Sequence, residues 1–314
     1  MEGKLYIVIP CYNEQEVLPE TEKRLTVKLK DMISRKLISE ESKIVFVDDG
    51  SKDTTWNMIC EMHQRNSLVQ GIKSSRNRGH QNTLLAGLMT VKDECDMAVS
   101  MDADLQDDIE VLDQFVQKFY DGCDIVYGVR SSRKKDTFFK KFTAQGFYKM
   151  MSAMGVDIVY NHADYRLMSR RALNELSNYK EVNLFLRGII PMIGFQTDVV
   201  PYERAERFAG ESKYPLKKMI SFAVDGITSL SIKPIRFICG LGFMVFFISI
   251  ILLIYCIVGS FAGNTVPGWA TIMVSIWALG GLQLLSIGII GEYIGKVYLE
   301  VKERPRYIVD QYLK

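Results

Sequence analysis

The sequence is poor in the residues that build several common kinds of site. It has 314 residues but only three histidines and six cysteines, and no two cysteines form a C-x-x-C pair. We therefore expect no zinc-binding or disulfide framework, but buried reduced thiols in a reducing compartment. The net charge is +2, which gives no case for a nucleic-acid partner. No G-x-G-x-x-G follows the first expected strand, and the P-loop motif G-x-x-x-x-G-K-[ST] is absent, which excludes a P-loop.

Charged residues are missing from two long runs near the C-terminus, residues 237–258 and 269–290. As helices of 22 residues, each would span about 33 Å, enough for a bilayer core. Basic residues flank the pair and the connector has no charge, so the positive-inside rule places both ends in the cytoplasm. No secretory signal opens the chain. We therefore expect a multi-pass protein of the cytoplasmic membrane with a C-terminal transmembrane hairpin; two buried core helices are the alternative.

The first 130 residues alternate between short β-rich runs and longer amphipathic stretches. Strands are expected at residues 5–9, 43–47, 69–73, 97–101 and 125–129, with helices near 14–35, 54–66, 81–91 and 109–120. This alternation predicts βαβ units and a mostly parallel sheet flanked by helices. In such sheets ligands bind beyond the carboxyl ends of the strands.

Acidic residues follow two of these strands, Asp48 and Asp49 after the second, Asp102 and Asp104 after the fourth. Residues two apart on an extended strand point the same way, so Asp102 and Asp104 could share one hard cation. Such a cation is often held by one or two carboxylates plus substrate phosphates. The chemistry that this suits is departure of a diphosphate leaving group.

Several motifs together resemble glycosyltransferase family 2. In chain order they are V-I-P-C-Y-N-E at 8–14, V-D-D-G-S at 47–51, N-R-G-H-Q at 77–81, D-A-D-L-Q at 102–106, D-Y-R-L at 164–167 and A-G-E-S-K-Y at 209–214. The set covers nearly the whole chain and, with the hairpin, is similar to the polyprenyl-phosphate glycosyltransferases of that family. The Q-x-x-R-W motif of processive members is absent, so a polysaccharide synthase is not expected.

The resemblance implies a GT-A nucleotide-binding fold and an inverting, metal-dependent transfer of a hexose. The implied donor is a UDP-sugar such as UDP-glucose, and the implied acceptor is undecaprenyl or another polyprenyl phosphate. The product would serve cell-envelope glycosylation. It implies that the nucleotide-sugar is bound by Pro10, Tyr12, Glu14, Asp48, Asp49 and Asp102. Mg²⁺ or Mn²⁺ would be held by Asp102, Asp104 and Gln106. The implied catalytic residues are Asp104, Arg130 and Asp164.

Two of these roles leave alternatives open. Asp164 is a candidate general base, but a phosphate acceptor is already anionic at pH 7, so Asp164 could instead orient Arg166 or the sugar hydroxyls, or form a structural salt bridge. Arg130 and Arg133 could bind the acceptor phosphate together with Lys213, or the basic cluster could be a solvated face. The stretches 136–154 and 212–232 could be helices on the bilayer surface or ordinary core helices.

These patterns divide the chain into four parts: a catalytic domain (1–211), an interfacial helix region (212–234), the hairpin (235–291) and a cytoplasmic tail (292–314). A non-enzymatic membrane sensor of nucleotide-sugars, or a scaffold, is the alternative function. The identity of the sugar and the presence or absence of a homo-oligomer stay open.

Overall fold

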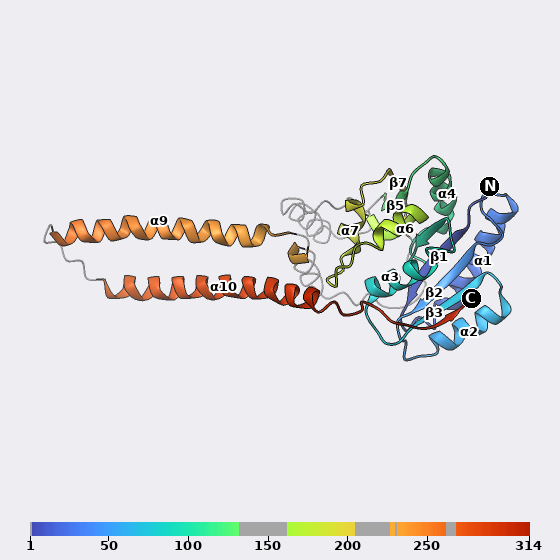
Figure 1. Cartoon of the computed structure of the whole chain (residues 1–314), viewed down its shortest axis with the longest axis horizontal. Coiled ribbons are helices and arrows are strands. Elements are labelled where there is room, and N and C mark those ends of the chain that lie inside the picture. The colour runs from blue at the N-terminus through green and yellow to red at the C-terminus, as the bar shows by residue number, and fades with distance from the viewer. Residues whose placement is uncertain (1, 132–161, 205–226, 230, 262–267) are drawn as a thin grey trace.

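The computed structural model describes residues 2–131, 162–204, 227–229, 231–261 and 268–314 (Figure 1). Its first half contains β1 (Leu5–Cys11), α1 (Leu18–Ser34), β2 (Lys43–Asp48), α2 (Thr55–Arg65), β3 (Val69–Ser74), α3 (His80–Val91), β4 (Met97–Ser100), η1 (Ile109–Val111), α4 (Leu112–Tyr120) and β5 (Ile125–Arg130). The strands and helices expected in this half are therefore confirmed. The second half contains β6 (His162–Ser169), α6 (Arg170–Leu176), α7 (Leu186–Met192), β7 (Thr197–Tyr202), α9 (Lys233–Phe261), α10 (Trp269–Val301) and β8 (Val309–Leu313).

The strands form one sheet in the order β7-β5-β6-β4-β1-β2-β3-β8. The central pairs β4/β1, β1/β2 and β2/β3 are parallel, whereas β6 runs antiparallel between β4 and β5. Ser100 near the end of β4 pairs with Arg166, and Val129 near the end of β5 pairs with His162. The first residues of β6 therefore lie at the edge where β4 and β5 end, and this brings Asp164 to the expected ligand-binding edge.

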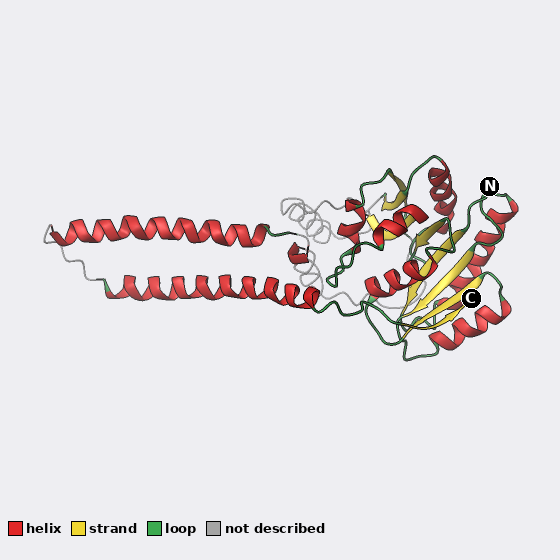
Figure 2. Cartoon of the chain, in the orientation of Figure 1, coloured by secondary structure: helices red, strands yellow, loops and turns green. Residues whose placement is uncertain are grey.

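Helices cover both faces of the sheet (Figure 2). One buried apolar cluster joins the sheet to α1, α2 and α4, and the other joins it to α3, α6 and α7. Gly87 on α3 allows a very close approach, because a Cβ there would lie 2.5 Å from Val8 Cγ1 and 2.6 Å from Val47 Cγ2. The helix α3 therefore packs tightly over β1 and β2, and its first residue, His80, lies above their carboxyl ends.

The two uncharged runs lie within α9 and α10, helices of 29 and 33 residues that lie side by side and project from the α/β part of the molecule (Figure 1). Crossing a bilayer takes a helix of about 20 mainly apolar residues. Within the described residues, no helix combines enough length and hydrophobicity to cross a membrane. The expectation of a transmembrane hairpin, and with it the multi-pass location in the cytoplasmic membrane, is therefore wrong on this finding.

The C-terminal residues do not form the separate tail that we expected. The strand β8 pairs antiparallel with β3 at the edge of the sheet. The Tyr312 hydroxyl lies 3.0 Å from Gln70 Oε1 and 3.1 Å from Glu94 Oε2, and Lys314 pairs with Glu94 at 2.9 Å. The end of the chain is thus part of the α/β domain. The expected amphipathic helix at 136–154 lies outside the described residues, as does most of the one at 212–232.

Candidate active site

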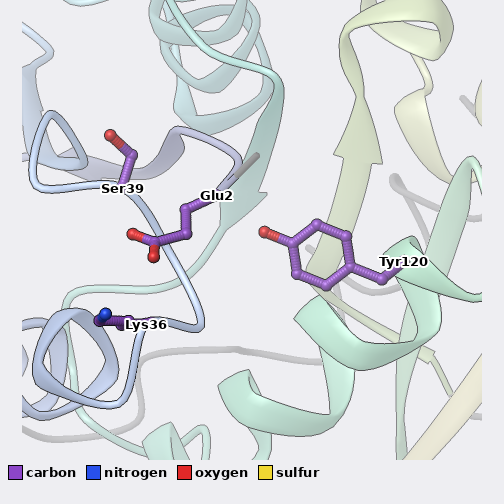
Figure 3. Close-up of a pocket in the computed structure, with 4 residues that line it drawn as sticks. All are labelled: Glu2, Lys36, Ser39 and Tyr120. Atoms are coloured by element: carbon purple, nitrogen blue, oxygen red, sulfur yellow. The ribbon is translucent and has the colours of Figure 1, made fainter.

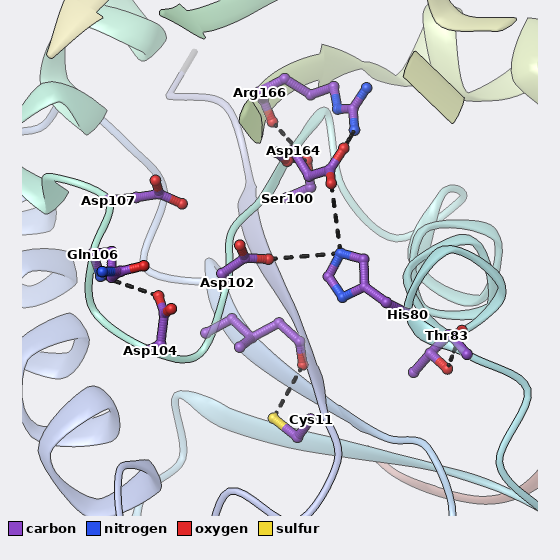
Figure 4. A network of polar contacts seen from close by, with 12 residues as sticks. Cys11, His80, Thr83, Ser100, Asp102, Asp104, Gln106, Asp107, Asp164 and Arg166 are labelled. Atoms are coloured by element: carbon purple, nitrogen blue, oxygen red, sulfur yellow. Dashed lines mark hydrogen bonds and ion pairs between the residues drawn. The ribbon is translucent and has the colours of Figure 1, made fainter. Parts of the chain in front are cut away.

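The D-A-D-L-Q segment forms a turn beyond β4. The strand ends at Ser100, and Leu105 adopts a left-handed conformation with φ of 56°, which is uncommon for a bulky residue and is often found at functional sites. Asp102 points toward His80, with Oδ1 3.6 Å from Nε2, whereas Asp104 Oδ1 accepts a hydrogen bond from the Gln106 backbone N–H at 3.2 Å (Figure 4). The extended geometry from which we argued a shared cation is therefore replaced by a turn.

Asp164 is held between two arginines. Its Oδ1 lies 2.7 Å from Arg166 Nη2, and Arg187 binds both carboxylate oxygens, with Nε–Oδ1 of 3.1 Å and Nη2–Oδ2 of 2.9 Å. Burial alone would raise the pKa of Asp164, but Arg187 and then Arg166 outweigh it and hold that pKa well below its usual range. A carboxylate with such a low pKa is a weak proton acceptor. This geometry favours the orienting role of Asp164 over the general-base role.

His80 connects these two carboxylates. Its Nε2 lies 3.6 Å from Asp102 Oδ1 and 3.8 Å from Asp164 Oδ2, so the first residue of α3 lies between the β4 turn and β6 (Figure 4). Ser100 ties the same two segments together, because its hydroxyl donates to the Asp164 carbonyl oxygen at 2.6 Å. Three segments far apart in sequence are thus joined at one edge of the sheet.

A second chain of contacts runs from Asp107 to β5. The Tyr202 hydroxyl donates to Asp107 Oδ1 at 2.5 Å, and Arg130 Nε donates to the same hydroxyl at 3.4 Å. Asp107 Oδ2 is buried and has no hydrogen-bond partner among the described residues. Burial first, and then the charge of Asp102, raise the pKa of Asp107 to about 7. Arg130 therefore lies beside the acidic cluster, which we define as Asp102, Asp104 and Asp107.

The carboxylates of the acidic cluster lie close enough together to affect one another's ionisation. Solvent reaches 39% of the Asp102 side chain, but the surrounding protein atoms still raise the pKa of Asp102. The charges of Asp164 and Asp104 raise this pKa further, whereas His80 lowers it. No group of three or more His, Cys, Asp or Glu side chains in the described ranges is arranged to hold a metal ion. The Gln106 side-chain oxygen accepts a hydrogen bond from Arg204. A metal here would thus need oxygen ligands from a substrate besides Asp102 and Asp104.

The acidic residues after β2 are used differently. Both oxygens of Asp49 accept backbone hydrogen bonds, from Arg78 N–H at 2.7 Å and Gly79 N–H at 2.9 Å. Gly50 has φ of 66°, and a Cβ there would lie 2.8 Å from the backbone nitrogen of residue 77, so only glycine fits. The Asp48 carboxylate accepts from Ser51 N–H at 3.2 Å, and burial raises its pKa. These contacts build the loops that lead to His80.

The remaining expected nucleotide-binding residues follow β1. Pro10 lies within the strand opposite Val47, and Tyr12 is 40% exposed just beyond its end. The Glu14 backbone N–H donates to Thr55 Oγ1 at 3.0 Å, which ties this loop to the start of α2. The three residues thus lie at the same edge as the acidic cluster, and their nucleotide-binding role stays a prediction.

Sequence reasoning missed several residues that the fold brings to this edge. They are Arg187, Asp107, Tyr202 and Arg204. Asp107 directly follows the acidic motif, so its position in the sequence was the one available signal. Arg187 and Tyr202 come from α7 and β7, whose place in the sheet no local pattern predicts. Arg133 and Lys213, expected near the acceptor phosphate, lie outside the described residues.

A hollow elsewhere on the domain is unrelated to this chemistry. It has a volume of about 570 Å³ and is lined by Glu2, Lys36, Ser39 and Tyr120, next to the start of β1 (Figure 3). The Tyr120 hydroxyl accepts from Gly3 N–H at 2.8 Å and donates to the Leu37 carbonyl at 2.9 Å. The polar tip of Tyr120 is thus used in joining chain segments, at the end of β1 opposite the acidic cluster.

Comparisons with known proteins agree with the motifs of this edge. The chain is 57% identical over 306 residues to the uncharacterized glycosyltransferase YkoT of Bacillus subtilis, covering 98% of this chain and 91% of that one. It is 40% identical over 308 residues to the SfII prophage-derived bactoprenol glucosyl transferase of Shigella flexneri, covering 98% and 97%. Mannosyl-3-phosphoglycerate synthase from Rubrobacter xylanophilus superposes with a TM-score of 0.48 at 13% identity, covering 71% of each chain. The family model for glycosyl transferase family 2 matches residues 6–177, more than half of the chain, and the protein therefore belongs to glycosyltransferase family 2.

Proposed function

We propose that this protein transfers a hexose from a nucleotide-sugar, UDP-glucose or a related UDP-hexose, to a polyprenyl phosphate. The observation that carries the proposal is the acidic cluster at the carboxyl edge of the sheet, in a chain that matches a bactoprenol glucosyl transferase over 98% of its length. Bactoprenol is a polyprenol, and its phosphate is an acceptor of the chemical kind that the expected basic residues suit.

The reaction forms one bond and breaks one. An oxygen of the acceptor phosphate attacks the anomeric carbon of the sugar from the face opposite the diphosphate, and the bond from that carbon to the diphosphate oxygen breaks. The product has inverted configuration, and the nucleoside diphosphate leaves. The acceptor oxygen is already ionised at pH 7, so no side chain needs to remove a proton. The low pKa of Asp164 suits this reaction, because Asp164 stays ionised and orients Arg187 and Arg166.

Asp102 and Asp104 fit a divalent cation, because the charge of Asp104 helps to raise the pKa values of Asp102 and Asp107 and a cation would relieve that repulsion. Mg²⁺ or Mn²⁺ held by these two residues and the donor diphosphate would neutralise the charge that grows on the leaving group. Arg130 would hold the acceptor phosphate beside this cluster through its planar guanidinium. Its place at the end of β5, next to Tyr202, keeps it at the same edge.

The test is a transfer assay with purified protein and a set of radiolabelled donors: UDP-glucose, UDP-galactose, UDP-N-acetylglucosamine and GDP-mannose. The acceptor is a short polyprenyl phosphate, and the matched control is the same polyprenol without the phosphate. We expect a labelled lipid with one UDP-hexose and the phosphorylated acceptor only. Nucleotide binding without any transfer across this set would contradict the proposal and support the non-enzymatic sensor.

A further inference from the structure

The long helix α10 contacts the segment that precedes α7 through the Glu300 side chain and through the Lys296 carbonyl, which accepts from Asn183 Nδ2 at 3.3 Å. Glu300, one residue before the end of α10, accepts hydrogen bonds from two consecutive backbone N–H groups, Val182 at 2.9 Å and Asn183 at 2.8 Å. It also accepts from Asn183 Nδ2 at 2.7 Å. Three donors thus converge on one carboxylate, which is more than a chance surface contact provides.

The segment that Glu300 binds has no regular secondary structure. Residues 177–185 lie between α6 and α7. Tyr179 and Phe185, near the ends of this segment, still bond to the neighbouring helices, whereas the N–H groups of Val182 and Asn183 donate to Glu300. Arg306 supports the same segment by donating to the Tyr179 carbonyl at 2.7 Å. Burial raises the pKa of Glu300, but the N–H groups of Val182 and Asn183 outweigh this effect and lower it overall. Glu300 is therefore ionised at neutral pH, which strengthens each of the three bonds.

This segment leads directly to the arginine that pairs with Asp164. Phe185 and Leu186 are buried at 3% and 1% exposure, and the Leu186 N–H donates to Gln81 Oε1 on α3 at 2.8 Å. Arg187 is the next residue and binds both oxygens of Asp164. A displacement at Asn183, four residues earlier, would therefore move the start of α7 and the guanidinium of Arg187.

We infer that Glu300 is a positioning residue for glycosyl transfer: by holding Val182 and Asn183, it fixes the start of α7 and the two-point contact of Arg187 with Asp164. We call these contacts the Glu300 clamp. This inference rests on the proposed function, because it takes the Asp164 region as the place of reaction. The clamp thereby links the position of α10 to that of Arg187, which follows Asn183 by four residues.

The direct test combines turnover and hydrogen exchange in Glu300→Gln, with Glu292→Gln as the matched control. Glu292 is an exposed residue of the same helix, so both variants lose one negative charge from α10. We expect Glu300→Gln to lower kcat about tenfold, because small misplacements of orienting groups are costly, and to change the donor KM much less. Amide exchange at residues 182–187 should speed up in Glu300→Gln and stay unchanged in Glu292→Gln.

A double-substitution experiment separates positioning from general destabilisation. Arg187→Lys removes the two-point contact by itself, so adding Glu300→Gln to it should cost little more if Glu300 acts through Arg187. Asn183→Ala is a second way to weaken the clamp if Glu300→Gln does not fold, and it should shift kcat and exchange in the same direction. Wild-type kcat and wild-type exchange in Glu300→Gln would overturn the inference, and so would multiplicative losses in the double variant. Hydrogen exchange can be measured without turnover. If the wild-type protein showed no transfer activity, the proposed function would be refuted, but the exchange rates at residues 182–187 would still show whether Glu300 holds this segment in place.

Discussion

Two groups of carboxylates lie at the same edge of the sheet and differ in what their oxygens contact. After β2, Asp49 has both oxygens bonded to backbone N–H groups of the loop that leads into α3. After β4, Asp102 and Asp107 lie near other carboxylates, and their pKa values are raised. The first arrangement stabilises a loop. The second concentrates negative charge, which costs folding free energy and is expected where a cation or cationic group is to be bound.

The comparison separates two roles that the sequence alone does not distinguish. D-D-G-S and D-A-D-L-Q both follow a parallel strand, and both were expected to contact the donor. In the structure, both carboxylate oxygens of Asp49 accept backbone hydrogen bonds, so a structural role is enough to explain an aspartate at this position. Asp107 has a buried oxygen that the described residues leave without a hydrogen bond, so the same argument fails for the acidic cluster. The following substitutions test this difference.

The largest effect is expected for Asp104→Asn. The substitution removes a charge from the acidic cluster, and the transfer rate should fall roughly 10³-fold, as for loss of a group that stabilises charge in the transition state. The melting temperature should stay the same or rise, because repulsion within the cluster decreases. Asp93→Asn, at an exposed carboxylate just beyond the C-terminal end of α3, is the control and should leave the rate unchanged. A near-normal rate for Asp104→Asn would remove the functional half of the comparison.

A smaller loss of rate is expected for Arg187→Leu. The change removes both hydrogen bonds to Asp164, each worth about 1.5–3 kcal/mol as a charge-assisted contact. We expect kcat to fall about tenfold to a hundredfold, which corresponds to about one of these two contacts acting in the transition state, because about 1.4 kcal/mol in the barrier is a factor of ten. Steady-state kinetics with the acceptor varied would measure it. Arg171→Leu, at an exposed arginine of α6 that contacts Asp124 at the other side of the domain, is the control. An unchanged kcat for Arg187→Leu would show that the ion pair with Asp164 is only structural.

Asp49→Asn should act mainly on stability. The amide keeps one acceptor oxygen but places an NH₂ group against a backbone N–H, so at least one of the two bonds is lost, at a cost of about 2 kcal/mol. Denaturant titration should show this loss, whereas the residual transfer activity should be far higher than that of Asp104→Asn. If Asp49→Asn instead abolishes UDP binding in a fully folded protein, Asp49 belongs to the donor site and the two groups are alike.

The smallest effect concerns acid stability. The folded pKa of Asp164 lies well below its usual range, so its contribution to stability is fully present above about pH 4, the ordinary pKa of an aspartate. That contribution is lost as the pH falls below about 4 toward the folded pKa. In Arg187→Leu the folded pKa is closer to normal, so the stability difference from wild type should shrink between about pH 4 and pH 2. Urea titrations at several pH values would measure it, and a constant difference would contradict the assignment of the low pKa to Arg187.

The sequence predicted the parts of this fold that depend on local patterns. Strand and helix positions up to residue 130 followed from hydrophobic periodicity, and the carboxyl-edge rule brought Asp49, Asp102 and Asp104 to one side of the sheet. The sequence did not predict that β6 inserts between β4 and β5, because the antiparallel pairing of β6 joins segments that are distant in the chain. For the same reason Arg187 and Glu300 were missed, since each acts through a contact with a residue far away in the chain.

Two expectations failed for physical reasons that the sequence hides. Asp102 and Asp104 were expected to alternate along an extended strand, but β4 ends at Ser100 and the motif turns at Leu105. The C-terminal residues were expected to be a tail, but β8 pairs with the open edge of β3, which satisfies backbone groups that would otherwise face solvent. In both cases local composition was compatible with either outcome, and tertiary pairing decided between them.

One measurement tests most directly the claim that Asp104 helps to hold a cation on the donor diphosphate. Isothermal calorimetry of UDP binding would be done with Mn²⁺ and with EDTA, in wild type and in Asp104→Asn. The account predicts that Mn²⁺ raises the affinity of wild type for UDP by at least about tenfold, one charge-assisted contact or more, and has little effect in the variant. Equal UDP affinity in Mn²⁺ and EDTA for the wild-type protein would contradict it.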